Sequence, residues 1–193
     1  KKTKAIVPMH YAGHMCDMGK IIKIAKKYNL IVIEDAAQAF GASLNKKMAG
    51  SFSIASSISM NPMKVLGGYG EAGIVLTNNK KIFNRLKILR HAGTLSDYKK
   101  KITNYCVAVS LNYKMDTLNA ALLLQAFKKY KKKYSKISQI AKIYDENLPN
   151  SIIRQKLLPN EKHARYAYPI LTRNRDKLRK YLIEKNIETK IFH

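Results

Sequence analysis

The sequence predicts an α/β protein built around a mainly parallel sheet. Two apolar stretches, residues 5–9 and 30–33, flank a segment with helical spacing, which is the pattern of a β-α-β unit. The second stretch is continuously apolar, as is typical of strands that a parallel sheet buries on both faces. Two further strand candidates, residues 54–60 and 74–77, precede another helical segment, so strands and helices continue to alternate.

The first helix is expected between residues 17 and 28. Asp17 is its candidate N-cap, because a carboxylate there can accept a hydrogen bond from the free amides of the first turn. Asn29 is expected to end the helix. Glu34 and Asp35 follow the next strand, which places them at the carboxyl edge of the sheet, where open α/β sheets bind their ligands. The apolar residues at helical spacing are Met18, Ile21, Ile22, Ala25 and Tyr28.

The later elements follow from the same patterns. A Gly-rich loop at residues 61–73 joins two strands, and a helix is expected at 79–90. A long helix is predicted over residues 116–148, and Pro149 should end it and mark a domain boundary. Its apolar stripe, which is typical of core packing, consists of Tyr130, Tyr134, Ile137, Ala141, Tyr144 and Leu148. The remaining predictions are a strand at 166–171, a helix at 175–185 and a strand at 190–193.

The composition fits an ordinary globular protein except in its charge. With 46% hydrophobic and 25% charged residues, the sequence excludes a disordered or fibrous protein. The excess of 37 Lys and Arg over 12 Asp and Glu gives a net charge of +25, which favours a polyanionic partner. The lysines are dispersed over every predicted helix, however, without the interleaved aromatics of a nucleic-acid module. We therefore expect solvated helix faces and no nucleic acid, and no apolar run suggests a membrane span.

The spacing of the cysteines and histidines indicates neither a disulfide framework nor a metal site. Cys16 and Cys106 show no CxxC spacing, which favours a reducing cytoplasm. His10, His14, Cys16 and Asp17 match no usual metal-ligand spacing, so we expect a loop with an N-cap and no metal. The chain begins at Lys1 without an initiator methionine, and its other end falls within an expected strand. Both ends suggest a fragment of a longer protein.

Three residues in sheet-edge loops suggest chemistry. Lys64 lies in a Gly-rich loop after a strand, and an earlier strand ends in Asp35, with Gln38 shortly after. Pyridoxal 5′-phosphate requires an amine for its Schiff base, a carboxylate for its ring nitrogen and donors for its phosphate. Taken singly, each of the three has a plain alternative: Asp35 as an N-cap, Lys64 as a solvated lysine and Gln38 as an exposed polar residue. Ser59, five residues before Lys64, could likewise be a hydroxyl satisfied by the backbone.

Four collinear stretches carry a resemblance to a known family. They are IEDAAQAFGA at 33–42, ISMNPMK at 58–64, GEAGIVLT at 70–77 and LNYKMDTLNAA at 111–121. Together they resemble the DegT–DnrJ–StrS group of sugar aminotransferases, within the fold-type I pyridoxal phosphate enzymes. The resemblance implies the aspartate-aminotransferase-like fold. Residues 1–148 would be the remainder of its large cofactor-binding domain, and residues 149–193 the start of a smaller α+β C-terminal domain, with 187–190 as a substrate-side strand.

The resemblance also implies a role for each matching residue. Lys64 would form the Schiff base and then shuttle a proton between the substrate carbon and the cofactor. Asp35 would pair with the pyridinium nitrogen, and Gln38 would face the ring or its 3-hydroxyl. Ser59 would donate its hydroxyl to the phosphate. Asn112 would reach the phosphate in a neighbouring subunit, which implies a homodimer with a shared active site.

The activity that the resemblance implies is a transamination in amino-sugar or surface polysaccharide biosynthesis. The amino group would come from an amino acid, typically L-glutamate, and pass to a nucleotide-linked keto-sugar. Lys64 argues against the family's dehydratase branch, which has a histidine at this position. The alternative is an inactive truncated relic or a basic binding module without catalysis. It is motivated by Ser110 and Lys114, where the family usually has Gly and Arg, and by the lack of any counterpart to the family's first half.

Overall fold

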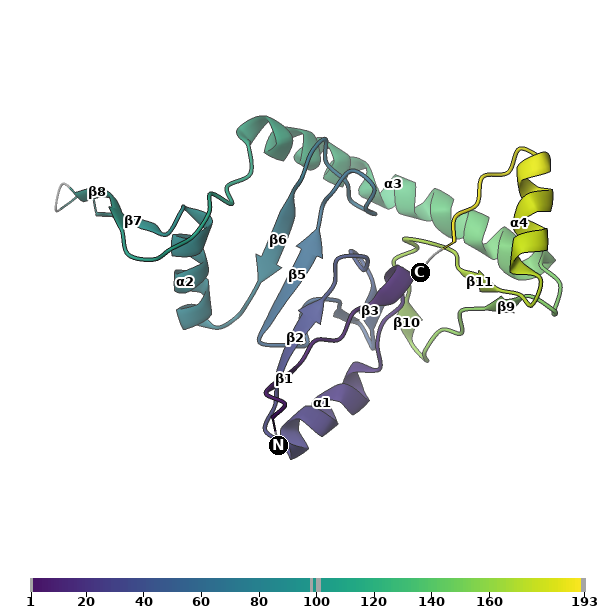
Figure 1. Ribbon diagram of the computed structural model, residues 1–193, viewed down its shortest axis with the longest axis horizontal. Helices are drawn as coiled ribbons and strands as arrows, with labels where there is room; N and C mark the ends of the chain where they lie inside the picture. Colours follow the sequence, from purple (N-terminus) through teal and green to yellow (C-terminus); the bar gives the residue numbers. More distant parts are fainter. Residues whose placement is uncertain (1, 98, 100–101, 192–193) are drawn as a thin grey trace.

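The centre of the fold is a four-stranded sheet in the order β1-β2-β5-β6 (Figure 1). The computed structural model describes residues 2–97, 99 and 102–191. Strands β1, β2 and β5 run parallel, and β6 pairs with β5 in the antiparallel direction. The expected α/β class with a mainly parallel sheet is confirmed. The bounds are Ala5–Ile6 (β1), Ile31–Asp35 (β2), Ala55–Ser59 (β5) and Gly73–Leu76 (β6).

Helix α1, Met18–Lys27, connects β1 to β2 as the sequence predicts. Asp17 is its N-cap and accepts a hydrogen bond from the Lys20 amide at 3.1 Å. Strand β1 is shorter than predicted, because Pro8 has no amide to donate to a neighbouring strand. The chain returns to the sheet at Met9, which forms an isolated bridge with Asp35.

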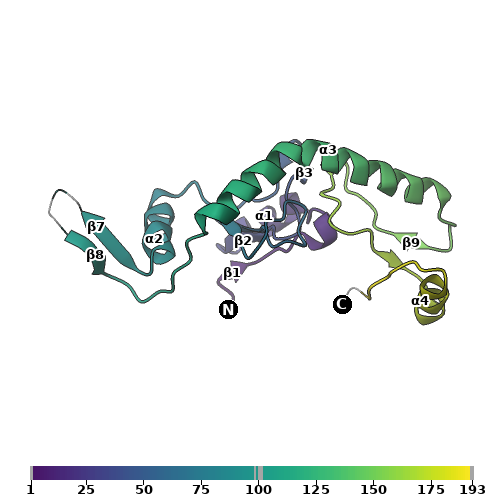
Figure 2. The same cartoon turned by 90° about the horizontal axis from the view of Figure 1, so that it is seen from above.

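Helices α2, Lys80–Arg90, and α3, Thr117–Asn147, also match their predicted ranges. Asn79 caps α2 by accepting hydrogen bonds from two first-turn amides. Helix α3 runs along the length of the molecule (Figures 1 and 2), and Tyr130, Tyr134 and Ala141 form its inner side. Tyr144 is an exception in the predicted stripe, because its ring is 46% exposed. The lysines of the opposite face are exposed: Lys128, Lys129, Lys131, Lys132, Lys133 and Lys136.

The core lies on the α1 side of the sheet and beyond its carboxyl edge. Met15 and Met18 are fully buried there, beside the alanines of the turn that follows β2. A second, smaller cluster places Leu123 of α3 against the loop that follows β5. Other apolar side chains of the sheet are exposed, and β6 is exposed along its whole length. Parallel sheets are usually covered on both faces, so this exposed apolar surface is unusual.

Two predicted strands are wrong in whole or in part. The strand predicted at 166–171 is reduced to β11, Ile170–Leu171, which pairs antiparallel with β9, Ile153–Arg154. The preceding amides of Ala164 and Ala167 instead donate to Gly13 and Ala12. No strand forms at 187–191, and Phe192 and His193 lie outside the described residues. Helix α4, Arg175–Glu184, agrees with its prediction.

Several short elements were not predicted. A three-stranded sheet in the order β10-β3-β4 ties the C-terminal part of the chain to the segment after β2. A hairpin of β7 and β8 projects beyond α2 (Figure 2). Among the described residues, no helix is both long and apolar enough to cross a membrane. The bounds are Tyr11–Gly13 (η1), Ser43–Leu44 (β3), Lys47–Met48 (β4), Thr94–Asp97 (β7), Ile102–Cys106 (β8) and Glu161–Lys162 (β10).

Candidate functional site

Asp35 and Ser59 end the paired parallel strands β2 and β5, so they lie at the same edge of the sheet. The Asp35 amide donates to the Pro8 carbonyl at 2.9 Å, and the Asp35 carbonyl accepts from the His10 amide at 3.0 Å. Its carboxylate Oδ1 accepts from the Ala37 amide at 3.0 Å. The backbone of Asp35 is therefore fixed on both sides, and its half-buried carboxylate lies at the predicted ligand edge.

Lys64 follows β5 in a tight turn at the same edge. Its amide donates to the Asn61 carbonyl at 2.8 Å, and the Asn61 side chain accepts from the Met63 amide at 3.0 Å, as asparagine does in turns. The Ser59 hydroxyl accepts from the Asn61 amide at 3.4 Å, which leaves its proton for another acceptor. The half-buried Lys64 ammonium lies over the ring of Tyr166, 4.9 Å from its centroid.

The loop that carries Lys64 is closed upon itself. The Gly68 amide donates to the Met60 carbonyl at 2.9 Å, and Met60 is buried in the second core cluster. Gly67 has no room for a side chain, because a Cβ there would overlap the Pro62 carbonyl oxygen. The glycines of this loop therefore allow a compact turn that presents Lys64 from a buried base.

Gln38 is buried, which contradicts its interpretation as an exposed polar residue. Its Oε1 accepts a hydrogen bond from the Ala12 amide at 2.6 Å. Ala12 has a positive φ of 57°, so the chain turns sharply where this bond forms. Because the side-chain oxygen is used by the backbone, the side-chain NH2 is the group that Gln38 can offer to a ligand.

Asn112 is not brought to this edge within the chain. It is exposed, lies between β8 and α3, and bridges to His91 at the end of α2. Its side chain accepts from the Lys114 amide at 3.4 Å. Figure 1 shows α2 and the β7–β8 hairpin at one end of the molecule, separated from β1 and β2 by the other two strands of the sheet. An open groove beside Asn112 is lined by basic groups, among them Lys87, Arg90 and Lys114.

Sequence reasoning missed a buried pair beside Asp35. His10 and Glu34 are both fully buried, and His10 Nε2 donates to Glu34 Oε1 at 3.0 Å. The Cys16 amide donates to His10 Nδ1 at 3.2 Å, which places the imidazole proton on Nε2. The Glu34 carboxylate also accepts from the Gly50 and Phe52 amides and from the Ser53 hydroxyl. The continuous apolar pattern before Glu34 could have indicated a buried carboxylate, but no local signal identifies its partners.

The electrostatics of Glu34 follow from these contacts. Burial alone would raise the pKa of its carboxyl group, but the hydrogen bonds from His10, Gly50, Ser53 and Phe52 outweigh burial and hold the pKa below its usual range. Glu34 is therefore a buried carboxylate that is satisfied by four donors, and it links the end of β1 to the segment before β5.

The candidate metal residues have separate partners. His10 faces Glu34, while His14 Nδ1 bonds to Glu161 Oε1 at 2.8 Å. Cys16 Sγ contacts the Met9 carbonyl, and Asp17 caps α1 as predicted. In the part of the chain that the structure describes, no three histidine, cysteine or acidic side chains are grouped to hold a metal ion.

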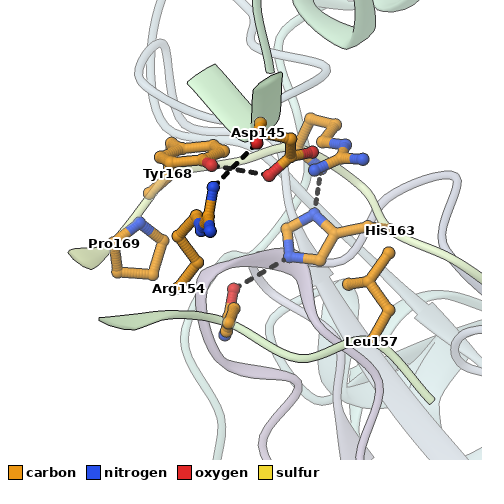
Figure 3. Close-up of a pocket in the computed structure, with 9 residues that line it drawn as sticks. Asp145, Arg154, Leu157, His163, Tyr168 and Pro169 are labelled. Atoms are coloured by element: carbon orange, nitrogen blue, oxygen red, sulfur yellow. Dashed lines mark hydrogen bonds between the residues drawn. The ribbon is translucent and has the colours of Figure 1, made fainter. Parts of the chain in front are cut away.

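A pocket near the end of α3 is held together by its own polar groups (Figure 3). His163 Nε2 donates to the Gln155 side chain at 3.1 Å, and Nδ1 accepts from the Arg165 amide at 2.8 Å. Burial and the nearby Arg165 lower the pKa of His163 to about 4, so the imidazole is neutral. The Tyr168 hydroxyl donates to Asp145 at 2.6 Å, and burial and this bond raise the pKa of Tyr168 to about 12. These pairings indicate a structural role.

The sheet-edge residues fit the chemistry of pyridoxal phosphate. Lys64 supplies an amine, Asp35 a carboxylate and Ser59 a hydroxyl whose proton is available. Gln38, three residues after Asp35, has a side-chain NH2 that its bond to the Ala12 amide leaves available. All four lie in or shortly after strands β2 and β5, as the sequence predicts, whereas Asn112 lies by the end of α2, away from this edge.

Comparison with known proteins shows which family the sequence matches. The profile of the DegT/DnrJ/EryC1/StrS aminotransferase family matches residues 1–193. A dTDP-3-amino-3,6-dideoxy-alpha-D-galactopyranose transaminase from Aneurinibacillus thermoaerophilus is 35% identical over 100% of this chain and 52% of its own. A GDP-perosamine synthase from Escherichia coli O157:H7 is 34% identical over 98% of this chain and 51% of its own.

Solved structures give the same result for the fold. The structure of S. venezuelae DesV in complex with a ketimine intermediate superposes with a TM-score of 0.88 at 28% identity, covering 97% of this chain and 49% of that chain. The chain therefore spans about half the length of the relatives that it matches. The predicted fold-type I architecture and the resemblance on which it was based are both confirmed.

Proposed function

Because this chain belongs to the DegT/DnrJ/EryC1/StrS aminotransferase family, we propose that its protein is a pyridoxal phosphate-dependent sugar aminotransferase. The proposed reaction transfers an amino group from an amino acid, with L-glutamate as the expected donor, to a nucleotide-linked keto-sugar in amino-sugar or polysaccharide biosynthesis. The observation that carries the proposal is that Asp35 and Ser59 end neighbouring parallel strands at one carboxyl edge, with Lys64 in the turn that follows the second strand.

Lys64 and Asp35 would perform the central steps. When bound, pyridoxal phosphate supplies an aldehyde for an amine and an electron-poor ring that stabilises negative charge on the substrate carbon. Lys64 Nζ would hold the cofactor and, once released, move a proton at the substrate carbon. The Asp35 carboxylate would accept a hydrogen bond from the ring nitrogen, and this charge-assisted bond would keep that nitrogen protonated.

Ser59 and Gln38 would orient the cofactor. Ser59 Oγ already accepts from the Asn61 amide, so its hydroxyl would donate to a phosphate oxygen. The Gln38 oxygen is held by the Ala12 amide, so its NH2 would face the ring or its 3-hydroxyl. Both side chains are fixed by backbone contacts, which reduces the conformational entropy that binding costs.

A homodimer with shared active sites would bring in Asn112. Its segment carries large exposed apolar residues: the side chain of Val109 is fully exposed, Leu111 is 69% exposed and Tyr113 is 65% exposed. Contiguous exposed apolar surface of this kind marks protein interfaces. A second copy docked on this segment would receive Asn112, together with the basic groups of Lys114 and Arg90, beside the phosphates of its own site.

We further propose that the chain contains parts of two domains and that the enzyme is cytoplasmic. Residues 1–148 would belong to the large cofactor-binding domain, and residues 149–193 would begin the smaller C-terminal domain. The break that supports this division is the end of α3 at Asn147, just before Pro149. We place the enzyme in the cytoplasm, in line with the two free cysteines, Cys16 and Cys106.

The decisive experiment follows the absorbance of the full-length protein encoded by its gene after it is incubated with pyridoxal phosphate. We expect a visible band of covalently bound cofactor that L-glutamate bleaches, and borohydride should fix the cofactor on Lys64, as peptide mapping would show. Lys64→Ala should abolish both signals. Lys47→Ala is the matched control, because Lys47 also lies over an aromatic ring, that of Phe52 at 4.6 Å, but outside the site.

Labelling of other lysines with Lys64 unmodified would contradict the proposal. In that case, nucleic-acid binding that weakens steeply with salt would favour the alternative of a basic binding module without catalysis.

A further inference from the structure

Residues 163–167, here called the strap, connect the C-terminal part of the chain to the candidate site. The Ala164 amide donates to the Gly13 carbonyl at 2.8 Å, and the Ala167 amide donates to the Ala12 carbonyl at 3.2 Å. Tyr166 lies between these two attachment points. The Ala12 amide in turn donates to Gln38, so the strap is fixed on the same loop that holds a predicted cofactor residue.

Gly13 makes this attachment possible. Its φ is +93°, and a Cβ at this position would lie 3.0 Å from Ala164 Cβ and 3.1 Å from the Tyr166 amide nitrogen. Any side chain here would therefore strain the backbone and push the strap away. The close approach of the two segments depends on a glycine.

The strap places the Tyr166 ring under the Lys64 ammonium, 4.9 Å from the ring centroid. Several other lysines lie over rings close to them in the sequence, as Lys27 does over Tyr28, although Lys162 also lies over a ring of another element, that of Tyr134 on α3. Tyr166 instead reaches Lys64 from beyond α3 and packs against the main core cluster, so the ring is held independently of the loop that carries the lysine. A cation held over an aromatic face loses part of its freedom to swing into solvent.

We propose that Tyr166 is a positioning residue for the Lys64 amine. This inference rests on the proposed function. The ring holds Nζ in a restricted position before the cofactor arrives, and the strap fixes the ring. A lysine side chain otherwise carries large rotamer entropy. Once the ordered ammonium has lost a proton to solvent, the neutral amine is already in place, so it captures the aldehyde faster, with loss of water.

The test measures the rate at which Lys64 of the full-length apoprotein captures pyridoxal phosphate, trapped with borohydride and quantified at the Lys64 peptide. Tyr166→Leu should slow capture about three- to tenfold, because the apolar bulk remains but the ring is lost. Tyr166→Phe keeps the ring and should stay within about twofold of the unaltered protein. Tyr28→Leu, which removes a ring from beneath a lysine on α1, is the matched control and should have no effect.

A second readout does not need the cofactor. In the apoprotein with 13C-methylated lysines, the Lys64 methyl resonance should be shifted upfield by the ring current, keep that shift in Tyr166→Phe and lose it in Tyr166→Leu. Gly13→Ala should also reduce the shift, because it displaces the strap, and it keeps the test available if Tyr166→Leu fails to fold.

The outcomes separate the two proposals. If the unaltered protein traps no cofactor on Lys64, the proposed function fails. If it does, and Tyr166→Leu or Gly13→Ala changes neither the capture rate nor the resonance, the positioning role of Tyr166 is overturned.

Discussion

The direction of the hydrogen bonds determines which ring nitrogen carries the proton in the buried histidines His163 and His10. The Arg165 amide donates to His163 Nδ1, so that nitrogen must keep its lone pair, and the proton resides on Nε2, which faces Gln155. In the same way, the Cys16 amide donates to His10 Nδ1, so the His10 proton resides on Nε2. That Nε2–H group donates a hydrogen bond to Glu34. Main-chain amides thus set the tautomers of two buried histidines, which no composition argument would reveal.

His163 should make stability depend on pH. Its folded pKa of about 4 lies below the usual 6.5, so between these values the unfolded chain binds a proton that the folded chain cannot. The free energy of unfolding should therefore fall as pH drops from 6.5 toward 4, by up to about 3 kcal/mol. Urea unfolding at several pH values would measure this fall.

The matched comparison is His163→Gln against His91→Gln. The first variant should flatten the pH dependence between 4 and 6.5, whereas the second should retain it. A slope that remains in His163→Gln would assign the effect to other groups.

Among the elements, α3 gains its position from a few aromatic contacts. Tyr130 packs edge-on against Phe40 at 5.1 Å between ring centroids, and its hydroxyl reaches the Phe40 carbonyl at 3.4 Å. The same hydroxyl occupies the space that a Cβ on Gly41 would need, so helix and turn fit closely. Tyr134 donates to the His163 carbonyl at 2.9 Å and so connects α3 to the strap.

Removal of the Tyr130 ring should therefore loosen α3 from the sheet. Tyr130→Ala should lower the free energy of unfolding by about 3 kcal/mol, as for other buried aromatic truncations, and Tyr130→Phe by less than about 1 kcal/mol. Guanidinium unfolding followed by circular dichroism would measure both. Lys131→Ala, on the exposed face of the same turn, should change stability by less than about 0.5 kcal/mol, and an equal loss in this control would refute the assignment.

At the scale of the whole molecule, the proposed site is divided between two places in the chain. Asp35, Gln38, Ser59 and Lys64 occupy the sheet edge, while Asn112 lies by the end of α2 beside exposed apolar residues. In the proposed homodimer, each subunit would contribute its Asn112 to the sheet-edge site of the other, so that two equivalent sites would form. The net charge of +25 would add a general attraction for sugar nucleotides, without selecting among them.

Subunit complementation tests this division. Lys64→Ala and Asn112→Ala homodimers should each be impaired as aminotransferases, with Lys64→Ala inactive. After subunits exchange, a hybrid dimer contains one site with both native residues, so mixing should restore about a quarter of the unaltered activity.

No gain on mixing, despite hybrid dimers visible by native mass spectrometry, would show that Asn112 acts within its own subunit or not at all. Asn147→Ala mixed with Lys64→Ala is the control, because Asn147 lies at the end of α3 and bonds to its own helix.

Local sequence patterns predict the helices α1 to α4, the strands β2, β5 and β6, and the placement of Asp35, Ser59 and Lys64 at one edge. Those features depend on local periodicity, caps such as Asp17, and the rule that parallel strands end together. The family resemblance added a role for Asn112, but neither the motifs nor the local pattern indicated the surroundings of Gln38 and Asn112.

Local patterns did not indicate four features that depend on the three-dimensional arrangement of the chain. They are the His10–Glu34 pair, the burial of Gln38, the short strands β3, β4, β9 and β10, and the strap that replaces the strand predicted from residue 166. In each case the partner lies far away along the chain. A residue's neighbours in sequence do not specify which distant donor, acceptor or ring it will meet, and close packing of the whole chain settles that choice.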